Sequence, residues 1–312
     1  MTPSAASPPA TGPDASAGRL MRLAAGASMS VAVLLIVAKA AVWLLTDSVA
    51  VLSSLLDSLL DAAASLVNLL AIRHALTPAD EDHRFGHGKA EPLAGLAQSA
   101  FICGSALILL MEVIHRIGVP QPVSRPELAI GVSLLAIVLS GGLVAFQRYV
   151  VARTRSVAIA ADSLHYGSDA LLNGAVIVSV VLSLWFAIPQ VDSLCGGAIA
   201  LWIFWGALRI ARQSLDLLMD RELPASERER IVAIAAAHPE VRDVHDLRTR
   251  SSGTHIFIQM HLELDGELRL RAAHDIADRV EGEIRAAFPH AEVIIHQDPA
   301  GIIEPHRLPA QA

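Results

Sequence analysis

The sequence predicts a membrane protein with an all-α domain of six transmembrane helices, followed by a small cytoplasmic α+β domain. Of the 312 residues, 53% are hydrophobic and 18% are charged, whereas an average soluble domain has about 25% charged residues. Six apolar segments each approach or exceed the roughly 20 residues that cross a hydrocarbon core. After Leu215 the sequence becomes charged and mixed in character. These patterns indicate a multi-pass membrane domain and a separate soluble domain.

The apolar segments and the charges between them predict the topology. The expected spans are residues 20–45, 49–72, 92–117, 128–150, 157–187 and 191–215. Basic residues lie before the first span, between the second and third, between the fourth and fifth, and after the sixth. The loops on the other side carry only Arg116 and Arg125. By the positive-inside rule, both termini are expected in the cytoplasm.

Four segments are expected along the chain. Residues 1–18 are rich in Pro, Ser and Ala, and such a composition favours disorder. Residues 19–216 are expected to form the membrane domain, residues 217–300 the cytoplasmic domain, and residues 301–312 a flexible tail.

The cytoplasmic domain is predicted to have the order α-β-β-α-β. A helix over residues 225–237 ends before Pro239, which cannot continue it. Two strands flank the turn sequence SSG, and the second alternates with Ile256, Ile258, Met260, Leu262 and Leu264 on one face. A helix over 270–287 and a strand in EVIIHQD complete the domain.

Composition excludes several classes of function. The net charge of −7 and the scattered basic residues offer no surface for nucleic acid. The two cysteines, Cys103 and Cys195, lie in apolar runs without CxxC spacing, so neither a thiolate site nor a disulfide framework is indicated. Any metal site must therefore use His, Asp and Glu.

Two pairs of ligand-type residues lie within predicted spans. Asp57 and Asp61 in the second span, and His165 and Asp169 in the fifth, are each spaced i, i+4 and so share a helix face. An ionised carboxylate at the bilayer centre costs roughly 2.5–3.5 kcal/mol, so such a pair needs compensation. A single membrane aspartate is often a hydrogen-bond partner between helices. Two pairs at matched depth favour a four-ligand site for Zn(II), with Fe(II), Cd(II) or Mn(II) as competitors.

Two further groups of histidines and acids lie outside the spans. In the loop TPADEDHRFGHGKAE, a turn can gather Asp80, His83 and His87 around one ion, although a solvated loop with chance histidines is the alternative. In the cytoplasmic domain, strand alternation lets His261, His296 and Asp298 converge with His245, although strand histidines are usually only solvated. His274 also stands out in this domain.

The motifs together resemble a known family. LLDSLLD, PADEDHRFGHGKAE, ADSLHYGSD, HDLRTR and VIIHQDP, in this order on six helices with a cytoplasmic domain, are similar to the cation diffusion facilitators of the bacterial zinc and ferrous-iron efflux type. The resemblance runs from about Arg19 to Pro299. It implies a homodimer in the bacterial inner membrane that exchanges a cytoplasmic divalent metal for protons, with a metallochaperone-like cytoplasmic domain.

The resemblance also implies roles for individual residues. Its transport site corresponds to Asp57, Asp61, His165 and Asp169, and its second site to Asp80, His83 and His87. Lys89 and Asp220 match a charge pair near the hinge between the two domains. The two-metal cytoplasmic site, which lies at the contact between two tail domains, corresponds to His245, His261, His274, His296, Gln297 and Asp298.

The expected function is therefore efflux of Zn(II), with Fe(II) and Cd(II) as alternatives, by alternating access coupled to protons. A membrane metalloenzyme is disfavoured because the sequence has no HExxH motif, no nucleophile elbow and no general base beyond the ligands. A metal sensor is also disfavoured. In a sensor the helices would only anchor the protein in the membrane, and such helices would not need intramembrane acids. Spacing does not specify direction; only the resemblance favours efflux over uptake.

Overall fold

The computed structural model describes residues 15–46, 49–118, 126–186 and 190–302. The chain divides into two compact units, one formed by Ser16–Leu215 and the other containing Asp216–Ala312. Residues 1–14 and 303–312, which include most of the expected disordered start and flexible tail, lie outside the described residues. Residues 15–18 belong to the first helix, which thus begins within the segment expected to lack structure.

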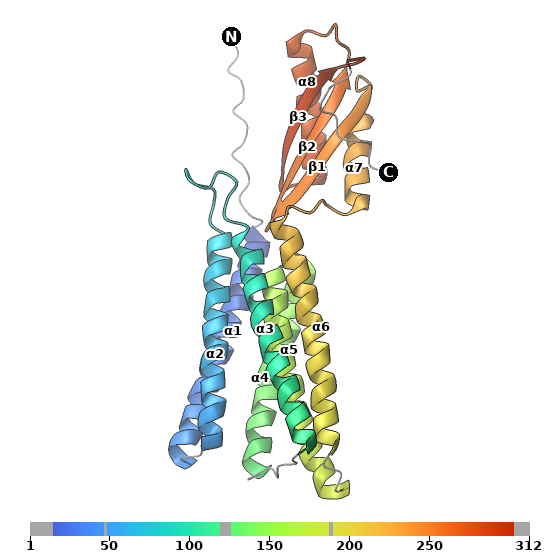
Figure 1. The fold of residues 1–312 in the computed structure, drawn as a ribbon. Coiled ribbons are helices and arrows are strands. Elements are labelled where there is room, and N and C mark those ends of the chain that lie inside the picture. The colour runs from blue at the N-terminus through green and yellow to red at the C-terminus, as the bar shows by residue number, and fades with distance from the viewer. Residues whose placement is uncertain (1–14, 47–48, 119–125, 187–189, 303–312) are drawn as a thin grey trace. The chain divides into compact units, whose positions relative to one another are not determined.

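The described residues of the membrane unit form six helices (Figure 1). They are α1 (Ala15–Thr46), α2 (Val49–Ala75), α3 (Ala90–Gly118), α4 (Pro126–Thr154), α5 (Val157–Phe186) and α6 (Gln190–Leu218). Each overlaps one predicted span. Among the described residues, α1 to α4 and α6 contain stretches with the length and hydropathy of a membrane span. The first half of α5 instead carries Asp162, His165 and Asp169.

The polar helix α5 packs along α4 and also contacts α3 and α2. One cluster near the ends of five helices contains the buried residues Met21, Ile72, Ala94, Val150 and Ile159. Small residues permit this close packing. A Cβ atom on Gly95 of α3 would lie 2.8 Å from Ser214 Oγ of α6 and 3.2 Å from a methyl of Val157. The start of α5 is thereby held against α3 and α6.

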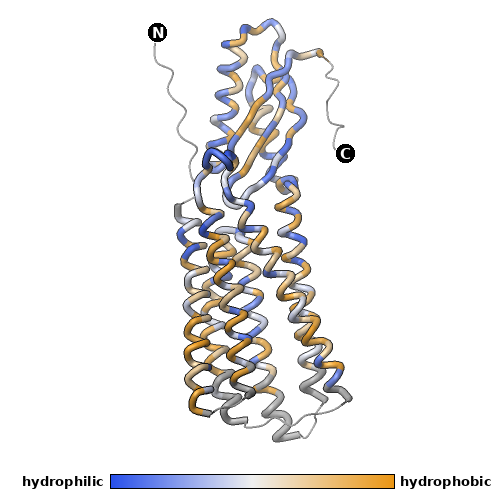
Figure 2. The backbone as a smooth tube through the Cα atoms, turned by 60° about the vertical axis from the view of Figure 1, so that its left-hand side comes forward, coloured by the Kyte–Doolittle hydropathy of each residue, from blue (hydrophilic) through white to orange (hydrophobic). Residues whose placement is uncertain are grey.

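Large apolar side chains cover the outer faces of these helices. Leu45, Leu60, Ile114 and Trp205 are 87%, 58%, 69% and 64% exposed. Figure 2 shows hydrophobic residues along much of the length of the helices. A water-soluble protein would bury such side chains, so these faces suit lipid. The helices thus turn apolar faces outward, whereas Asp162, His165 and Asp169 of α5 lie between helices.

The second unit is an α+β domain. It comprises α7 (Ala225–Ala236), β1 (Asp243–Ser252), β2 (His255–Leu264), α8 (Leu270–Ala287) and β3 (Ala291–Pro299). The sheet order is β1-β2-β3, with β1 antiparallel and β3 parallel to β2. The predicted order α-β-β-α-β is confirmed.

One face of this sheet forms the core and the other is open. Ile258, Met260 and Leu262 of β2 pack with Ile231 of α7 and Ile284 of α8. The predicted alternation of β2 is therefore confirmed on its apolar face. A register shift between His245 and Arg248 includes Asp246, whose φ is +49°. This bulge allows His245 to pair with His261 while the end of β1 near the turn keeps its own register.

Candidate metal sites

The membrane unit brings three of the four expected transport residues together. His165 Nε2 lies 3.1 Å from Asp61 Oδ1 and 3.8 Å from Asp169 Oδ2. One ligand atom from each residue lies within 4.8 Å of the other two. Asp61 comes from α2, whereas His165 and Asp169 lie one turn apart on α5. Two helices therefore contribute to one cluster of an imidazole and two carboxylates.

Asp57 is not part of this three-residue group. It lies one turn before Asp61 on α2 and is exposed in the single chain. Nearby, Lys39 of α1 donates hydrogen bonds to Ser58 Oγ at 2.6 Å and to the Ser54 carbonyl at 3.1 Å. A cation of α1 is thus tied to the segment of α2 that carries Asp57.

Aromatic and hydroxyl groups hold the His165 ring in place. The rings of Phe101 and Tyr166 pack edge-on against it, with centroids 6.1 Å and 5.4 Å away. The Tyr166 hydroxyl lies 3.0 Å from Ser65 Oγ, which lies 3.2 Å from Ser28 Oγ. This hydroxyl chain joins α5 to α2 and α1 beside the cluster.

A buried acid supports the same part of α5. Asp162 is fully buried; Gln98 of α3 donates to Oδ1 at 3.2 Å, and Gln147 of α4 donates to Oδ2 at 2.6 Å. Neither Asp162 nor the two glutamines was predicted as a site residue. The one sequence feature that could have pointed to Gln98 and Gln147 is a polar amide side chain within an otherwise apolar segment. Asp162 therefore connects α3, α4 and α5 one turn from His165.

The α2–α3 loop places both expected histidines beside the Asp80 carboxylate. His83 Nδ1 lies 3.2 Å from Asp80 Oδ1, and His87 Nε2 lies 3.3 Å from Asp80 Oδ2. Gly86, with a φ of +76°, turns the chain between the two histidines. The backbone N–H of His83 also donates to Asp80 Oδ1 at 2.6 Å, and this bond is the main reason why the pKa of Asp80 lies below its ordinary value. Asp80 is thus kept ionised and suited to a cation.

His74 was not expected near this loop. It lies in the last turn of α2, and its ring centroid is 4.5 Å from that of His87. Sequence spacing alone could not relate it to His87, because the two residues are separated by an irregular loop.

The open face of the cytoplasmic sheet brings four expected residues together. Three histidines lie beside the Asp298 carboxylate: His261 Nδ1 is 2.8 Å from Oδ2, His245 Nε2 is 3.4 Å from the same oxygen, and His296 Nε2 is 3.2 Å from Oδ1. Strand register explains this arrangement. His245, His261 and His296 pair across β1, β2 and β3, and Asp298 follows two residues later on the same face.

The other tail residues lie elsewhere in the single chain. His274 lies on α8, where its Nε2 is 3.5 Å from Asp278 and its side chain is 63% exposed. Gln297 pairs with Leu262, in the row that faces the core. Glu263 and Asp243, which sequence reasoning did not select, lie 3.7 Å and 3.8 Å from His245 Nδ1. Their signal was available, since both occupy the row of Asp298.

The expected hinge pair lies in different units. Asp220 has a left-handed φ of +56°, and its Oδ1 lies 3.5 Å from Arg250 Nη1 within the cytoplasmic unit. Lys89 lies just before α3 in the membrane unit. Their pairing stays a prediction.

Each of the three clusters contains a buried imidazole nitrogen with no hydrogen-bond partner among the described residues. These atoms are His165 Nε2, His87 Nδ1 and His245 Nδ1. Buried polar atoms are bonded in the great majority of cases, so an unbonded one calls for an ion or water. An imidazole nitrogen beside carboxylates is a suitable ligand for a borderline divalent cation such as Zn(II).

The chain is similar to known proteins over most of its length. The model of the cation efflux transmembrane domain matches residues 26–219, and that of the cation efflux protein cytoplasmic domain matches residues 223–300. The chain is 50% identical over 286 residues to the cation-efflux pump FieF of Cronobacter sakazakii, covering 92% of this chain and 95% of the relative. It is 48% identical to FieF of Klebsiella pneumoniae over the same shares.

Solved structures match about a quarter of the chain. The zinc form of CzrB is 34% identical, covering 27% of this chain and 98% of that one, with a TM-score of 0.26. The metal-bound C-terminal domain of the CzcD transporter from Thermotoga maritima is 31% identical, covering 25% and 93%, with a TM-score of 0.25. On the family models and the FieF relatives together, the chain belongs to the cation efflux, or cation diffusion facilitator, family of membrane transporters.

Proposed function

We propose that this cation efflux protein exports Zn(II) from the cytoplasm in exchange for protons. The observation that carries the proposal is the His165 imidazole, 7% exposed, whose Nε2 lies 3.1 Å and 3.8 Å from carboxylates of α2 and α5. Within a membrane unit, such a group requires a compensating cation or a proton. Asp57, one turn before Asp61, is the fourth ligand in this proposal.

Exchange follows from the chemistry of these ligands. Metal binding needs a neutral imidazole and ionised carboxylates, so binding releases protons and protonation weakens binding. When the site faces the cytoplasm it loads metal. When it faces the other side, protons replace the metal on His165 and the aspartates, and the protonated site returns. An inward proton gradient then drives export through alternating access.

Ligand type supports zinc as the main cargo. One imidazole with carboxylates suits Zn(II), and Fe(II) and Cd(II) fit the same donors. The affinity order places Zn(II) above Fe(II) for a given site. A sensor or an enzyme has less support, because the family is one of transporters and the described clusters offer only ligand residues.

The cytoplasmic cluster is proposed to bind metal and to stabilise a homodimer. Its histidines lie on the open sheet face, where another copy of the domain could pack, and the matched family domain is the cytoplasmic one. Metal bound there would bias the transporter by stabilising one arrangement of the two copies. Both termini are proposed to lie in the cytoplasm and the helices in the bacterial inner membrane.

The test is zinc flux in sealed proteoliposomes that enclose a metal dye and a pH dye. Zinc entry with opposite proton movement is expected for the natural protein and is expected to vanish in Asp61→Ala and Asp57→Ala. Glu112→Gln is the matched control, since it removes an acid of the membrane unit outside the cluster. Metal binding without flux, or flux unchanged in both aspartate variants, would contradict the proposal.

A further inference from the structure

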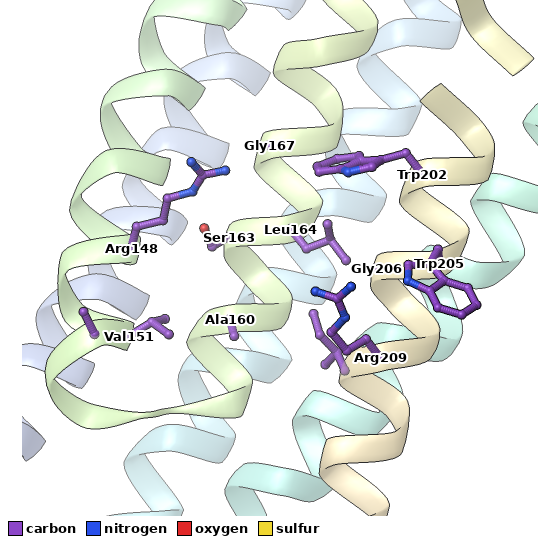
Figure 3. Close-up of a pocket in the computed structure, with 12 residues that line it drawn as sticks. Arg148, Val151, Ala160, Ser163, Leu164, Gly167, Trp202, Trp205, Gly206 and Arg209 are labelled. Carbon is purple, nitrogen blue, oxygen red and sulfur yellow. The ribbon is translucent and has the colours of Figure 1, made fainter. Parts of the chain in front are cut away.

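The membrane unit contains a second candidate binding site on the opposite side of α5 from the transport cluster. A cavity of about 420 Å³ lies between α4, α5 and α6. Arg148 of α4, Ser163 of α5, and Trp202 and Arg209 of α6 are among its lining residues. Figure 3 shows Arg148 directed from α4 toward Ser163, with Arg209 and Trp202 directed from α6 toward α5.

The cavity carries positive charge without a compensating acid. Its twelve lining residues include two arginines and no aspartate or glutamate. Neither Arg148 nor Arg209 has an ion pair or side-chain hydrogen bond within the described part of the chain. A single arginine near a helix end usually extends to the membrane surface. Here two arginines from different helices line one cavity, and a guanidinium group binds phosphate oxygens through two parallel hydrogen bonds, so the cavity suits an anion.

The depth of the cavity suits the boundary between lipid headgroups and acyl chains. The 29 residues of α4 span about 44 Å, which exceeds the roughly 30 Å of hydrocarbon by about 7 Å at each end. Arg148 lies six residues, or about 9 Å, before the end of α4 at Thr154. Trp202 and Trp205 lie near the middle of α6 and line the deeper part of the cavity, at the level of the acyl chains.

We propose that this cavity binds the headgroup phosphate of an anionic phospholipid, with its acyl chains against the apolar surface of α6. The lipid belongs to the leaflet that surrounds the α4–α5 connection, which is the cytoplasmic leaflet in the proposed topology. Basic pockets between transmembrane helices on that side are suited to such headgroups.

A lipid in this cavity would act on the helix that carries half of the transport site. Ser163 and Gly167 are two residues before His165 and Asp169, so they face roughly 200° away around α5. On the cavity side, α5 and α6 are in close contact, because a Cβ atom on Gly206 would lie 3.0 Å from Leu164 Cδ2. The lipid thus joins α4 and α6 across α5 and stabilises the position of the metal ligands.

Lipid binding to the purified full chain tests this proposal. Native mass spectrometry would count phosphatidylglycerol and phosphatidylcholine molecules retained by the natural protein and by the double variant Arg148→Gln/Arg209→Gln. Phosphatidylglycerol binding is expected to weaken about 25-fold in the variant, since each basic residue near an anionic surface contributes about fivefold. Arg148→Lys/Arg209→Lys is expected to retain most of the binding, which separates charge loss from misfolding.

A matched control removes two arginines of the same helices outside the cavity. Arg153 stacks on Tyr149, and Arg212 is an exposed residue of α6. Arg153→Gln/Arg212→Gln is expected to keep phosphatidylglycerol binding. Equal losses in both glutamine variants, or no loss in either, would overturn the proposal.

Transport measurements distinguish the source of the anion. Zinc flux is expected to rise when phosphatidylglycerol is added to phosphatidylcholine vesicles, and this rise is expected to disappear in Arg148→Gln/Arg209→Gln. The same rise with inorganic phosphate in phosphatidylcholine vesicles would assign the cavity to a soluble anion and overturn the lipid. A change in oligomeric state with unchanged lipid binding would assign it to a second copy of the chain.

Discussion

The membrane cluster and the cytoplasmic cluster use similar side chains but position them by different means. In the cytoplasmic domain, three histidines pair across three hydrogen-bonded strands, and Asp298 lies on the same face. In the membrane unit, Asp61 comes from α2, whereas His165 and Asp169 come from α5. Backbone hydrogen bonds fix the first arrangement, whereas the packing of two helices fixes the second.

This difference suits retention at one site and release at the other. Strand register cannot change without breaking the sheet, so the cytoplasmic ligands keep their distances. Helices can shift by small rigid-body movements, which would separate Asp61 from His165 without unfolding either helix. Three imidazoles also make a softer donor set than one imidazole with carboxylates. We therefore expect tighter, structural binding at the cytoplasmic cluster and exchangeable binding at the membrane cluster.

The largest expected effect is on zinc transport, and it tests whether the two clusters act independently. His165→Ala removes the imidazole of the membrane cluster, and zinc transport is expected to fall more than about 100-fold, because even the partners of metal ligands contribute 10–100-fold. Zinc binding at the cytoplasmic cluster is expected to stay unchanged. Proteoliposome flux and calorimetric titration of the same preparation measure both. Loss of cytoplasmic binding in this variant would show that the clusters are not independent.

The reverse substitution has a smaller expected effect on transport. Asp298, which is 4% exposed and contacts three histidines, is central to the cytoplasmic cluster. Asp298→Asn is expected to weaken zinc binding there by at least about tenfold and to lower flux only a few-fold, through the dimer. Asp265→Asn is the control, since Asp265 pairs with Arg242 outside the cluster. A complete loss of flux in Asp298→Asn would place this cluster in the transport path itself.

Sequence patterns predicted the fold and the two faces of β2. Alternation along β2 placed Met260 and Leu262 in the core and His261 on the open face, because a strand has a simple period. The structure did not bring His274 to the cytoplasmic cluster of the single chain, since α8 lies over the apolar face. The partnership of Asp162 with Gln98 and Gln147 joins three helices, and helix periodicity within one segment carries no information about it.

That partnership makes the packing of the membrane cluster testable. Gln147→Ala removes the donor to Asp162 Oδ2 and leaves a buried carboxylate oxygen without its partner. The expected loss is about 1–3 kcal/mol of stability in the membrane unit, because an unsatisfied buried polar group retains its desolvation cost. Thermal unfolding in detergent measures it. Gln213→Ala, at an exposed position of α6, is the control and is expected to leave the transition unchanged.

The smallest expected effect is on the local order of the loop cluster of Asp80, His83 and His87. This cluster differs from the other two because its central carboxylate, that of Asp80, is exposed. The His83 amide lowers the pKa of Asp80 below its ordinary value of 3.8, so the ionised carboxylate stabilises the folded loop. This stabilisation is fully present above that value and is lost as the pH falls through the lower pKa of the folded loop. Hydrogen exchange of the 80–87 segment should therefore show the same protection factors at pH 5 and pH 7. Asp80→Ala should speed exchange at both pH values, whereas Asp82→Ala, which keeps the Asp80 carboxylate, should not. A loss of protection between pH 7 and pH 5 in the natural protein would mean that groups other than Asp80 order the loop.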